Sequence, residues 1–321
     1  MSEFALELRG VTKYYGRRKA LDGLDLAVPT GSVCGLVGSN GAGKTTTMAV
    51  ATGMLRARDG TINVLGQGPF DPAVHTGRVA LLPQDTELPR VARVRELLIF
   101  YAELQGMDRC RARACASEIL EWVHLADRAD STIRSLSHGM RRRLMLAQAF
   151  LGEPELVLLD EPQSGLDPRE VANVRSLLQE RRGRQTILIS SHNLHELERI
   201  CDHVAFIENG RALRMDTMAA VTGREHVLQF RLGRGAVPVE ELCRRLPAAV
   251  FEWPEAKLQA PDAEGTLLCR YAEADGSAAA INGAVLKALL DAGVEVLEVR
   301  RGSELEAAFL GQGATPRATP G

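Results

Sequence analysis

The segment GSNGAGKT, Gly38–Thr45, constrains the fold of this chain more than any other part of it. It matches the spacing G-x-x-x-x-G-K-[ST], and a sequence of this composition does so by chance in roughly one case in a hundred or less. An apolar strand candidate, Val33–Val37, precedes the segment, and helical spacing follows it. A glycine-rich turn with an exposed lysine would explain neither the spacing nor this context. The segment therefore predicts a phosphate-binding loop between a strand and a helix.

Each residue type in this loop suits a phosphate ligand. Glycines let backbone N–H groups wrap around phosphates without obstruction from a Cβ atom. Lys44 can reach the β- and γ-phosphates of a nucleotide, and the Thr45 hydroxyl can bind Mg²⁺. The loop residues expected to bind the nucleotide are Ser39, Asn40, Gly41, Ala42, Gly43, Lys44, Thr45 and Thr46.

A second segment, ELVLLDEP, Glu155–Pro162, supplies the carboxylates that such a loop needs. It reads as a buried apolar strand that ends in two acids. Asp160 is expected to hold Mg²⁺ through its water shell, and Glu161 to polarise the attacking water as a general base. An isolated Asp-Glu pair is usually a capped turn. Beside a phosphate loop, the functional interpretation is favoured.

The pattern along the chain predicts an α/β fold. Alternation in Ala5–Arg9 and Leu24–Val28 indicates short antiparallel strands near the start. Apolar runs typical of a mostly parallel sheet buried on both faces follow at Val33–Val37, Val79–Leu82, Leu156–Leu159 and Thr186–Ser190. Helical spacing is found at Val94–Leu104, Arg111–Val123, Gly139–Phe150, Arg169–Arg181 and Leu194–Cys201. Asn209-Gly210, within Phe206–Leu213, predicts a hairpin.

The alternation of strands and helices stops at 222–225, which is the predicted linker between a first domain over 1–221 and a second over 226–310. The second domain reads βαββαβ, the split βαβ or ferredoxin-like arrangement. Its expected elements are Val227–Leu232, Val239–Leu246, Ala249–Trp253, Thr266–Tyr271, Ser277–Asp291 and Val294–Arg300. Ser303 and Glu306 form a capping box for one more short helix, Leu305–Leu310. Residues 311–321 are expected to be disordered.

Composition excludes several other classes of protein. The net charge of −2 implies no strong global attraction to nucleic acid or to an anionic membrane. No apolar run approaches the length of a membrane span, and the start has no signal-peptide pattern. The six cysteines are scattered without a CxxC pair, so reduced thiols are expected rather than disulfides or a zinc site.

Four further motifs narrow the function: LLPQD with Gln84, LSHGM with Ser137, SGLDP with Asp167, and ILISSH with His192. With them the chain closely resembles the nucleotide-binding subunit of an ABC transporter, in the order and in the spacing of its motifs. The resemblance covers about Leu6 to Arg214. It implies a P-loop NTPase fold of ABC type, which has an N-terminal antiparallel β subdomain and a helical subdomain.

The resemblance also implies roles for the matching residues. Tyr15 matches the aromatic residue that stacks on adenine, with Tyr14 as a rival. Gln84 matches the loop glutamine that contacts the metal and senses the membrane partner. His192 matches the switch histidine that contacts the γ-phosphate, and Asp167 matches the acid that communicates between the two sites of a dimer. Alone, Asp167 would read as the N-cap of the helix after Pro168.

LSHGM stands where the family signature LSGGQ is expected. Ser137 and Gly139, which the phosphate contact needs, are retained, and His138 and Met140 depart from the common form. A helix is expected to start here, so its free N–H groups would meet the γ-phosphate of ATP held by the loop of the other protomer. A Ser–His pair adjacent in a turn is a poor nucleophile motif. Arg141–Arg143 are expected to form a solvated helix face.

The implied function is ATP hydrolysis in an exporter whose ATPase chain is separate from its membrane permease. The implied ligands are ATP and Mg²⁺. The implied partners are a permease and a second copy of the chain, without nucleic acid, and the expected location is cytoplasmic, on the inner face of the cell membrane. One alternative is a soluble ABC-type ATPase without a membrane partner. A metabolic P-loop kinase is another, against which the signature and the switch histidine argue.

Overall fold

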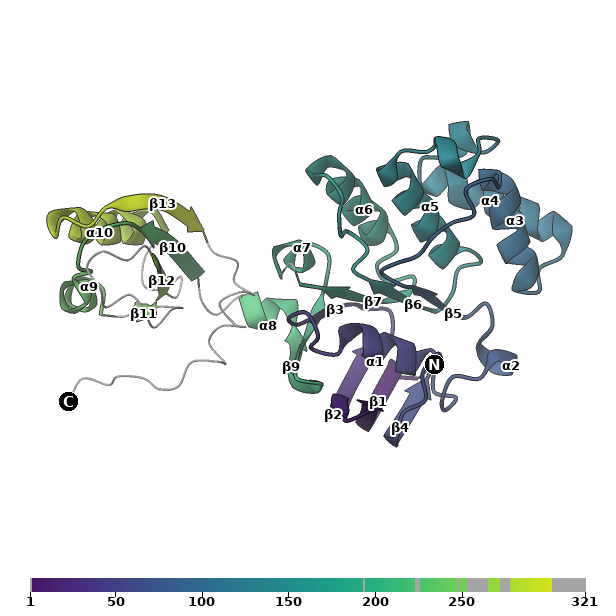
Figure 1. The fold of residues 1–321 in the computed structure, drawn as a ribbon, viewed down its shortest axis with the longest axis horizontal. Coiled ribbons are helices and arrows are strands. Elements are labelled where there is room, and N and C mark those ends of the chain that lie inside the picture. The colour runs from purple at the N-terminus through teal and green to yellow at the C-terminus, as the bar shows by residue number, and fades with distance from the viewer. Residues whose placement is uncertain are drawn as a thin grey trace. The chain divides into compact units, whose positions relative to one another are not determined.

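The computed structural model describes residues 2–192, 194–222, 226–247, 249–252, 265–271 and 278–301. Contacts divide the chain into two compact units, Met1–Asp216 and Thr217–Gly321. Figure 1 shows the elements of both units. A boundary at 222–225 stays a prediction, because residues 223–225 lie outside the described residues.

A six-stranded sheet forms the centre of the first unit, in the order β5-β6-β7-β3-β8-β9. The pairs β5/β6, β6/β7, β7/β3 and β3/β8 are all parallel. Every residue of β3, β6 and β7 is buried, as expected for strands covered on both faces. The strands are β3 Val33–Val37, β5 Val79–Leu82, β6 Leu156–Asp160, β7 Thr186–Ser191, β8 His203–Glu208 and β9 Arg211–Thr217. The parallel sheet predicted from the apolar runs is confirmed.

A second sheet of three antiparallel strands, in the order β2-β1-β4, completes the β structure of this unit. Its strands are β1 Phe4–Tyr15, β2 Arg18–Pro29 and β4 Asp59–Val64. Buried side chains of β1 and β2 share one apolar core with α1, Lys44–Ala51, and with the central parallel strands. The antiparallel pair near the start is confirmed. The sequence did not indicate β4, which has one buried residue.

Helices cover both faces of the parallel sheet, with α5 and α6 on one side and α1 on the other (Figure 1). The remaining helices of the first unit are α2 Pro72–His75, α3 Val94–Leu104, α4 Arg109–Trp122, α5 His138–Phe150, α6 Pro168–Glu180 and α7 Leu194–Glu198, with 3₁₀ turns at Ala126–Arg128 and Ile133–Ser135. In the part of the chain that the structure describes, no helix combines the length and apolar character needed to cross a membrane.

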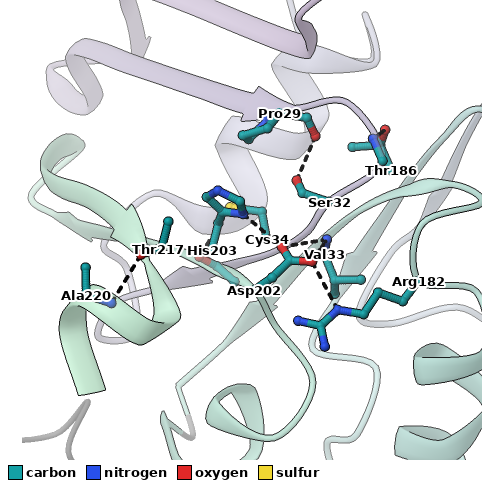
Figure 2. A network of polar contacts seen from close by, with 12 residues as sticks. Pro29, Ser32, Val33, Cys34, Arg182, Thr186, Asp202, His203, Thr217 and Ala220 are labelled. Carbon is teal, nitrogen blue, oxygen red and sulfur yellow. Dashed lines mark hydrogen bonds and ion pairs between the residues drawn. The ribbon is translucent and has the colours of Figure 1, made fainter. Parts of the chain in front are cut away.

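Polar contacts anchor the amino end of the strand that leads to the phosphate loop (Figure 2). The Asp202 carboxylate accepts hydrogen bonds from Val33 N at 3.0 Å and from Arg182 Nε at 3.1 Å, and it lies 2.8 Å from His203 Nδ1. These contacts tie the start of β3 to the start of β8. Beside them, burial raises the pKa of the Cys34 thiol to about 12, so this thiol is unreactive at neutral pH.

The turn between β8 and β9 contains Asn209 and Gly210 at φ values of 49° and 76°. Two successive positive φ values are the requirement of a type I′ hairpin turn, which explains the choice of Asn-Gly. The predicted hairpin is confirmed.

The second unit contains a four-stranded sheet in the order β11-β12-β10-β13, whose pairs are antiparallel. Its elements are α8 Met218–Thr222, β10 His226–Leu232, α9 Val239–Arg245, β11 Val250–Glu252, β12 Gly265–Tyr271, α10 Ala278–Asp291 and β13 Val296–Arg301. The element order after α8 is the βαββαβ expected from the sequence. The helix predicted at Leu305–Leu310 and the tail at 311–321 lie outside the described residues.

Removal of the second unit should leave the first unit folded, because each has its own apolar core. A chain truncated after Arg224 is expected to stay soluble, to unfold cooperatively on heating and to bind ATP. Thermal unfolding followed by circular dichroism, together with titration of a fluorescent ATP analogue, would measure this. Global unfolding of the truncated chain would show that the two units share one core.

Candidate nucleotide site

The predicted site residues gather at one edge of the parallel sheet. The phosphate loop follows β3, Gln84 follows β5, Asp160 ends β6 with Glu161 directly after it, and His192 follows β7. The carboxyl ends of parallel strands meet at the same edge, which is where ligands bind in open α/β sheets. The sheet therefore brings together residues that are far apart in the sequence.

Backbone geometry at the end of the phosphate loop requires glycine. Gly43 is the N-cap of α1 at a φ of 115°, and a Cβ atom there would lie 2.9 Å from Ala20 O. The next residue, Lys44, is buried, and its Nζ donates hydrogen bonds to the carbonyls of Gly38 at 2.8 Å and Ser39 at 3.2 Å. The lysine ammonium is thus held inside the loop that is expected to bind phosphate.

Lys44 also faces the two carboxylates at the end of β6. Its Nζ lies 3.8 Å from Glu161 Oε1, and both side chains are buried. Burial lowers the pKa of the Lys44 ammonium, and the carboxylates of Glu161 and Asp160 oppose that shift. The structure thus places a buried cation beside the two carboxylates that the sequence predicts for this site.

Ser190 on β7 fixes the backbone and the side chain of this acidic pair. The Ser190 hydroxyl donates to Asp160 Oδ1. The Glu161 N–H donates to Ser190 Oγ at 2.9 Å and to Ser190 O at 3.2 Å. Asp160 Oδ2 is buried without a hydrogen-bond partner, so one acceptor next to the loop remains available.

That available acceptor is what a Mg²⁺ site would use. Among the described residues, no group of three or more His, Cys, Asp or Glu side chains could hold a metal. Mg²⁺ does not need such a group, because it is usually held by one or two carboxylates together with substrate phosphates and water. The residues therefore fit the ion, with Asp160 as the carboxylate and the exposed Thr45 as the hydroxyl ligand.

His192 pairs with the predicted general base. Its Nδ1 lies 3.0 Å from Glu161 Oε2 and 3.1 Å from Glu161 Oε1. With the proton on Nδ1, the imidazole donates to the carboxylate, and Nε2 is left as an acceptor. The histidine side chain is 57% exposed, so the side of the pair that it occupies is open to solvent.

The arginines after the signature are placed differently from the expectation. Arg142 and Arg143 are only 7% and 8% exposed, so the predicted solvated face for Arg141–Arg143 is wrong for these two. Arg143 Nη1 donates to Val123 O at 2.8 Å, and Arg143 Nε lies 3.2 Å from Glu170 Oε2. Arg142 donates to the backbone carbonyls of Glu161, the predicted general base, and Pro162. A buried arginine is tolerated when its donors are used in this way.

The signature residues start α5 as expected, with Ser137 as the N-cap that accepts from Met140 N at 3.2 Å. Gly139 has a second constraint inside the chain. A Cβ atom there would lie 2.5 Å from Glu170 Cγ, so glycine lets α6 approach α5 closely. His138 lines a pocket of about 550 Å³ together with Gln84 and Gly165.

Asp167 is the N-cap of α6. Its Oδ1 accepts hydrogen bonds from the N–H groups of Arg169 and Glu170, both at 3.0 Å. This agrees with the interpretation of Asp167, taken alone, as the N-cap of the helix that begins at Pro168. The role between two sites stays a prediction.

The structure separates the two tyrosine candidates for adenine stacking. Tyr14 has two cations over its ring, Arg58 at 5.1 Å and Lys19 at 5.6 Å from the centroid, whereas Tyr15 has Lys13 at 5.8 Å, ends β1 and is 49% exposed. Tyr15 pairs with Arg18, and Arg18 Nη2 lies 3.1 Å from where a Cβ atom of Gly41 would be. The β1–β2 turn therefore lies beside the phosphate loop, which favours Tyr15.

Sequence reasoning missed several residues at this site. Ser190 could have been suspected, since it precedes the ILISSH histidine on the strand beside β6. Arg18, Arg142 and Glu170 left no local signal, because their contacts join segments far apart in the chain.

Comparison with known proteins gives a consistent result. Residues 21–164 match the family model described as ABC transporter. The chain is 40% identical over 218 residues to the Nod factor export ATP-binding protein I of Burkholderia orbicola (strain AU 1054), which covers 66% of the chain and 71% of that relative. It is also 40% identical over 235 residues to the daunorubicin resistance ATP-binding protein DrrA3 of Streptomyces coeruleorubidus, covering 71% and 73%.

Solved structures with the same fold include one described as an ATP binding subunit of an ABC transporter. It matches with a TM-score of 0.61 and 28% identity, over 68% of this chain and 91% of that one. The cbiO1 subunit from Clostridium perfringens matches with a TM-score of 0.61 and 25% identity, over 68% and 91%.

Proposed function

Since this chain belongs to the ATP-binding subunits of ABC transporters, and is accordingly an ATPase, we propose that it drives export through a separate membrane permease. The observation that carries the catalytic part is the group formed by Lys44, Asp160, Glu161 and His192 at one edge of the parallel sheet. Relatives named for Nod factor export and daunorubicin resistance support export as the direction. The expected location is the cytoplasmic face of the membrane, where the permease would hold the chain.

The proposed reaction is attack of water on the γ-phosphate of ATP, which breaks the bond from the γ-phosphorus to the β–γ bridging oxygen and releases ADP and phosphate. Glu161 accepts the proton of that water, and His192, hydrogen-bonded through Nδ1 to the same carboxylate, holds it in place. With both ring nitrogens protonated, its Nε2–H would donate to the γ-phosphate. Lys44 contacts the β- and γ-phosphates in place of the carbonyls it now meets. Thr45, Asp160 and Gln84 would hold Mg²⁺, and the ion would supply positive charge against the negative charge that develops on the phosphates.

We propose further that two copies of the chain close on ATP. The start of α5, with Ser137 and Gly139, offers free N–H groups and the positive end of a helix dipole. In the closed dimer these groups meet the γ-phosphate held by the loop of the other protomer. Asp167, at the start of α6, would then lie near the same junction.

The permease contact can be tested on α3. Phe100 and Leu104 are 53% and 64% exposed and stand four residues apart, so they share one face of this helix. Large apolar side chains gathered on one exposed face indicate a partner surface. Replacement of both by serine should weaken binding of the permease by about 30-fold, as expected for anchor residues of an interface.

The measurement is co-purification in detergent with a candidate permease, chosen from neighbouring reading frames by its apolar spans of about twenty residues. Val74→Ser, which alters another exposed apolar side chain on α2, is the matched control and should leave binding unchanged. Undiminished binding by the α3 variant would exclude this surface. Failure of the unaltered chain to bind any membrane protein would favour a soluble ATPase.

A further inference from the structure

Arg142 makes an unusual set of contacts for a residue on a helix that starts at the signature. Its Nη2 donates to Glu161 O at 2.5 Å, its Nε to Pro162 O at 2.7 Å, and its Nη1 to Gln84 O at 3.3 Å. The guanidinium is therefore hydrogen-bonded to backbone on both segments that carry catalytic side chains. Only an arginine, with its planar set of donors, can make all three bonds at once.

The backbone that Arg142 holds is strained. Glu161 has a φ of 46°, in the left-handed region that non-glycine residues rarely adopt. Such a conformation costs on the order of 1–3 kcal/mol and persists only when surrounding contacts hold it. Its N–H is held by Ser190, and its carbonyl is held by Arg142. Without one of these anchors, the residue is expected to relax and its carboxylate to move.

We propose that Arg142 is a positioning residue, which holds the strained backbone of Glu161 so that the carboxylate stays in place for hydrolysis. This inference rests on the proposed role of Glu161 as the general base. Because Arg142 lies one helical turn from Gly139, it also links the start of α5 to that base. In a closed dimer, the guanidinium would join the signature that serves one ATP to the general base that serves the other.

Arg143 provides a comparison on the same helix. It is buried to the same extent and donates to the carbonyls of Val123 and His124, at the end of α4. Its ion pair with Glu170 joins α5 to α6. Both arginines stabilise α5, so a general loosening of this helix would follow from the loss of either one. Of these two arginines, only Arg142 donates to Glu161.

The test is a double-mutant cycle on steady-state ATP hydrolysis. Arg142→Met keeps most of the side-chain volume and removes the donors, and kcat should fall roughly tenfold to a hundredfold, as for other misplaced catalytic groups. The dissociation constant for ATP should stay within a few-fold of its normal value, because Lys44 and the phosphate loop are unchanged. In a Glu161→Gln background the same substitution should lower kcat by less than about threefold, since the base that Arg142 positions is already absent.

Three results would overturn the proposal: a kcat of Arg142→Met close to that of the unaltered chain, an equal loss in both backgrounds, or the same background dependence for Arg143→Met. Arg142→Lys keeps the charge and should fold, but it cannot reach all three carbonyls, so its kcat should be intermediate. If Arg142→Met does not fold, a normal kcat of folded Arg142→Lys overturns the proposal. Normal turnover in Glu161→Gln alone would instead refute the base, which keeps the two failures distinct.

Discussion

Glu161→Gln should lower ATP hydrolysis by roughly a hundredfold or more, because the amide keeps the shape of the carboxylate but cannot accept the proton of the attacking water. Binding of ATP should stay near normal, since Lys44 and the phosphate loop are unaltered. The structure adds a reason to expect little disturbance of the backbone. Glu161 is fixed through its N–H and carbonyl, which the substitution leaves intact.

Because ATP is then bound but not cleaved, the variant should accumulate as an ATP-dependent dimer. Light scattering with and without ATP would measure the dimer, and phosphate release would measure turnover. Glu155→Gln is a matched control, since Glu155 lies just before β6, at the opposite end from Glu161, and pairs with Arg78. The control should hydrolyse ATP normally. Turnover of Glu161→Gln within a few-fold of the unaltered chain would exclude this residue as the base.

The fold could be predicted largely from sequence because its strongest signals are local. The runs VCGLV and LVLLD are continuous and apolar, and they became the fully buried strands β3 and β6. The helix Val94–Leu104 was predicted with the same bounds that it has in the structure. The strand β4 was missed, because its residues are mostly exposed or half-buried and show little alternation.

The same holds for the site: residues in short motifs could be predicted from the sequence, whereas contacts between distant segments could not. The residues of the phosphate loop and the carboxylates of β6 follow from motifs, since spacing within a short segment carries the chemistry. Burial of Arg142 could not be predicted, because the carbonyls that satisfy it belong to segments around Gln84 and Glu161, far along the chain. The run of three arginines looked like a solvated face for that reason. The close approach of Glu170 to Gly139 is likewise a contact between two helices.

A mixed dimer of two inactive chains should regain one working ATP site. In the proposed dimer each site takes Lys44 from one chain and Ser137 from the other. Lys44→Ala removes the cation of the phosphate loop, and Ser137→Arg places bulk and charge where the γ-phosphate of the other chain must lie. Each variant alone then forms a dimer with two defective sites. In a mixed dimer one site carries both defects and the other carries neither.

The expected result of mixing is occlusion of about one ATP per mixed dimer, because nucleotide bound across the interface stabilises the closed state by linkage. Occlusion is the better readout, since one intact site need not sustain full turnover. Ser137→Arg also removes the N-cap of α5, which should lower the free energy of unfolding by about 1 kcal/mol. Thermal unfolding must therefore show that this variant is folded. Each variant mixed with a differently tagged copy of itself is the control and should occlude none. If sites were built within single chains, every site in the mixture would keep one defect. Mixed dimers that form, as shown by their two tags, but occlude no ATP would therefore rule out the shared site and leave Ser137 as an ordinary helix cap.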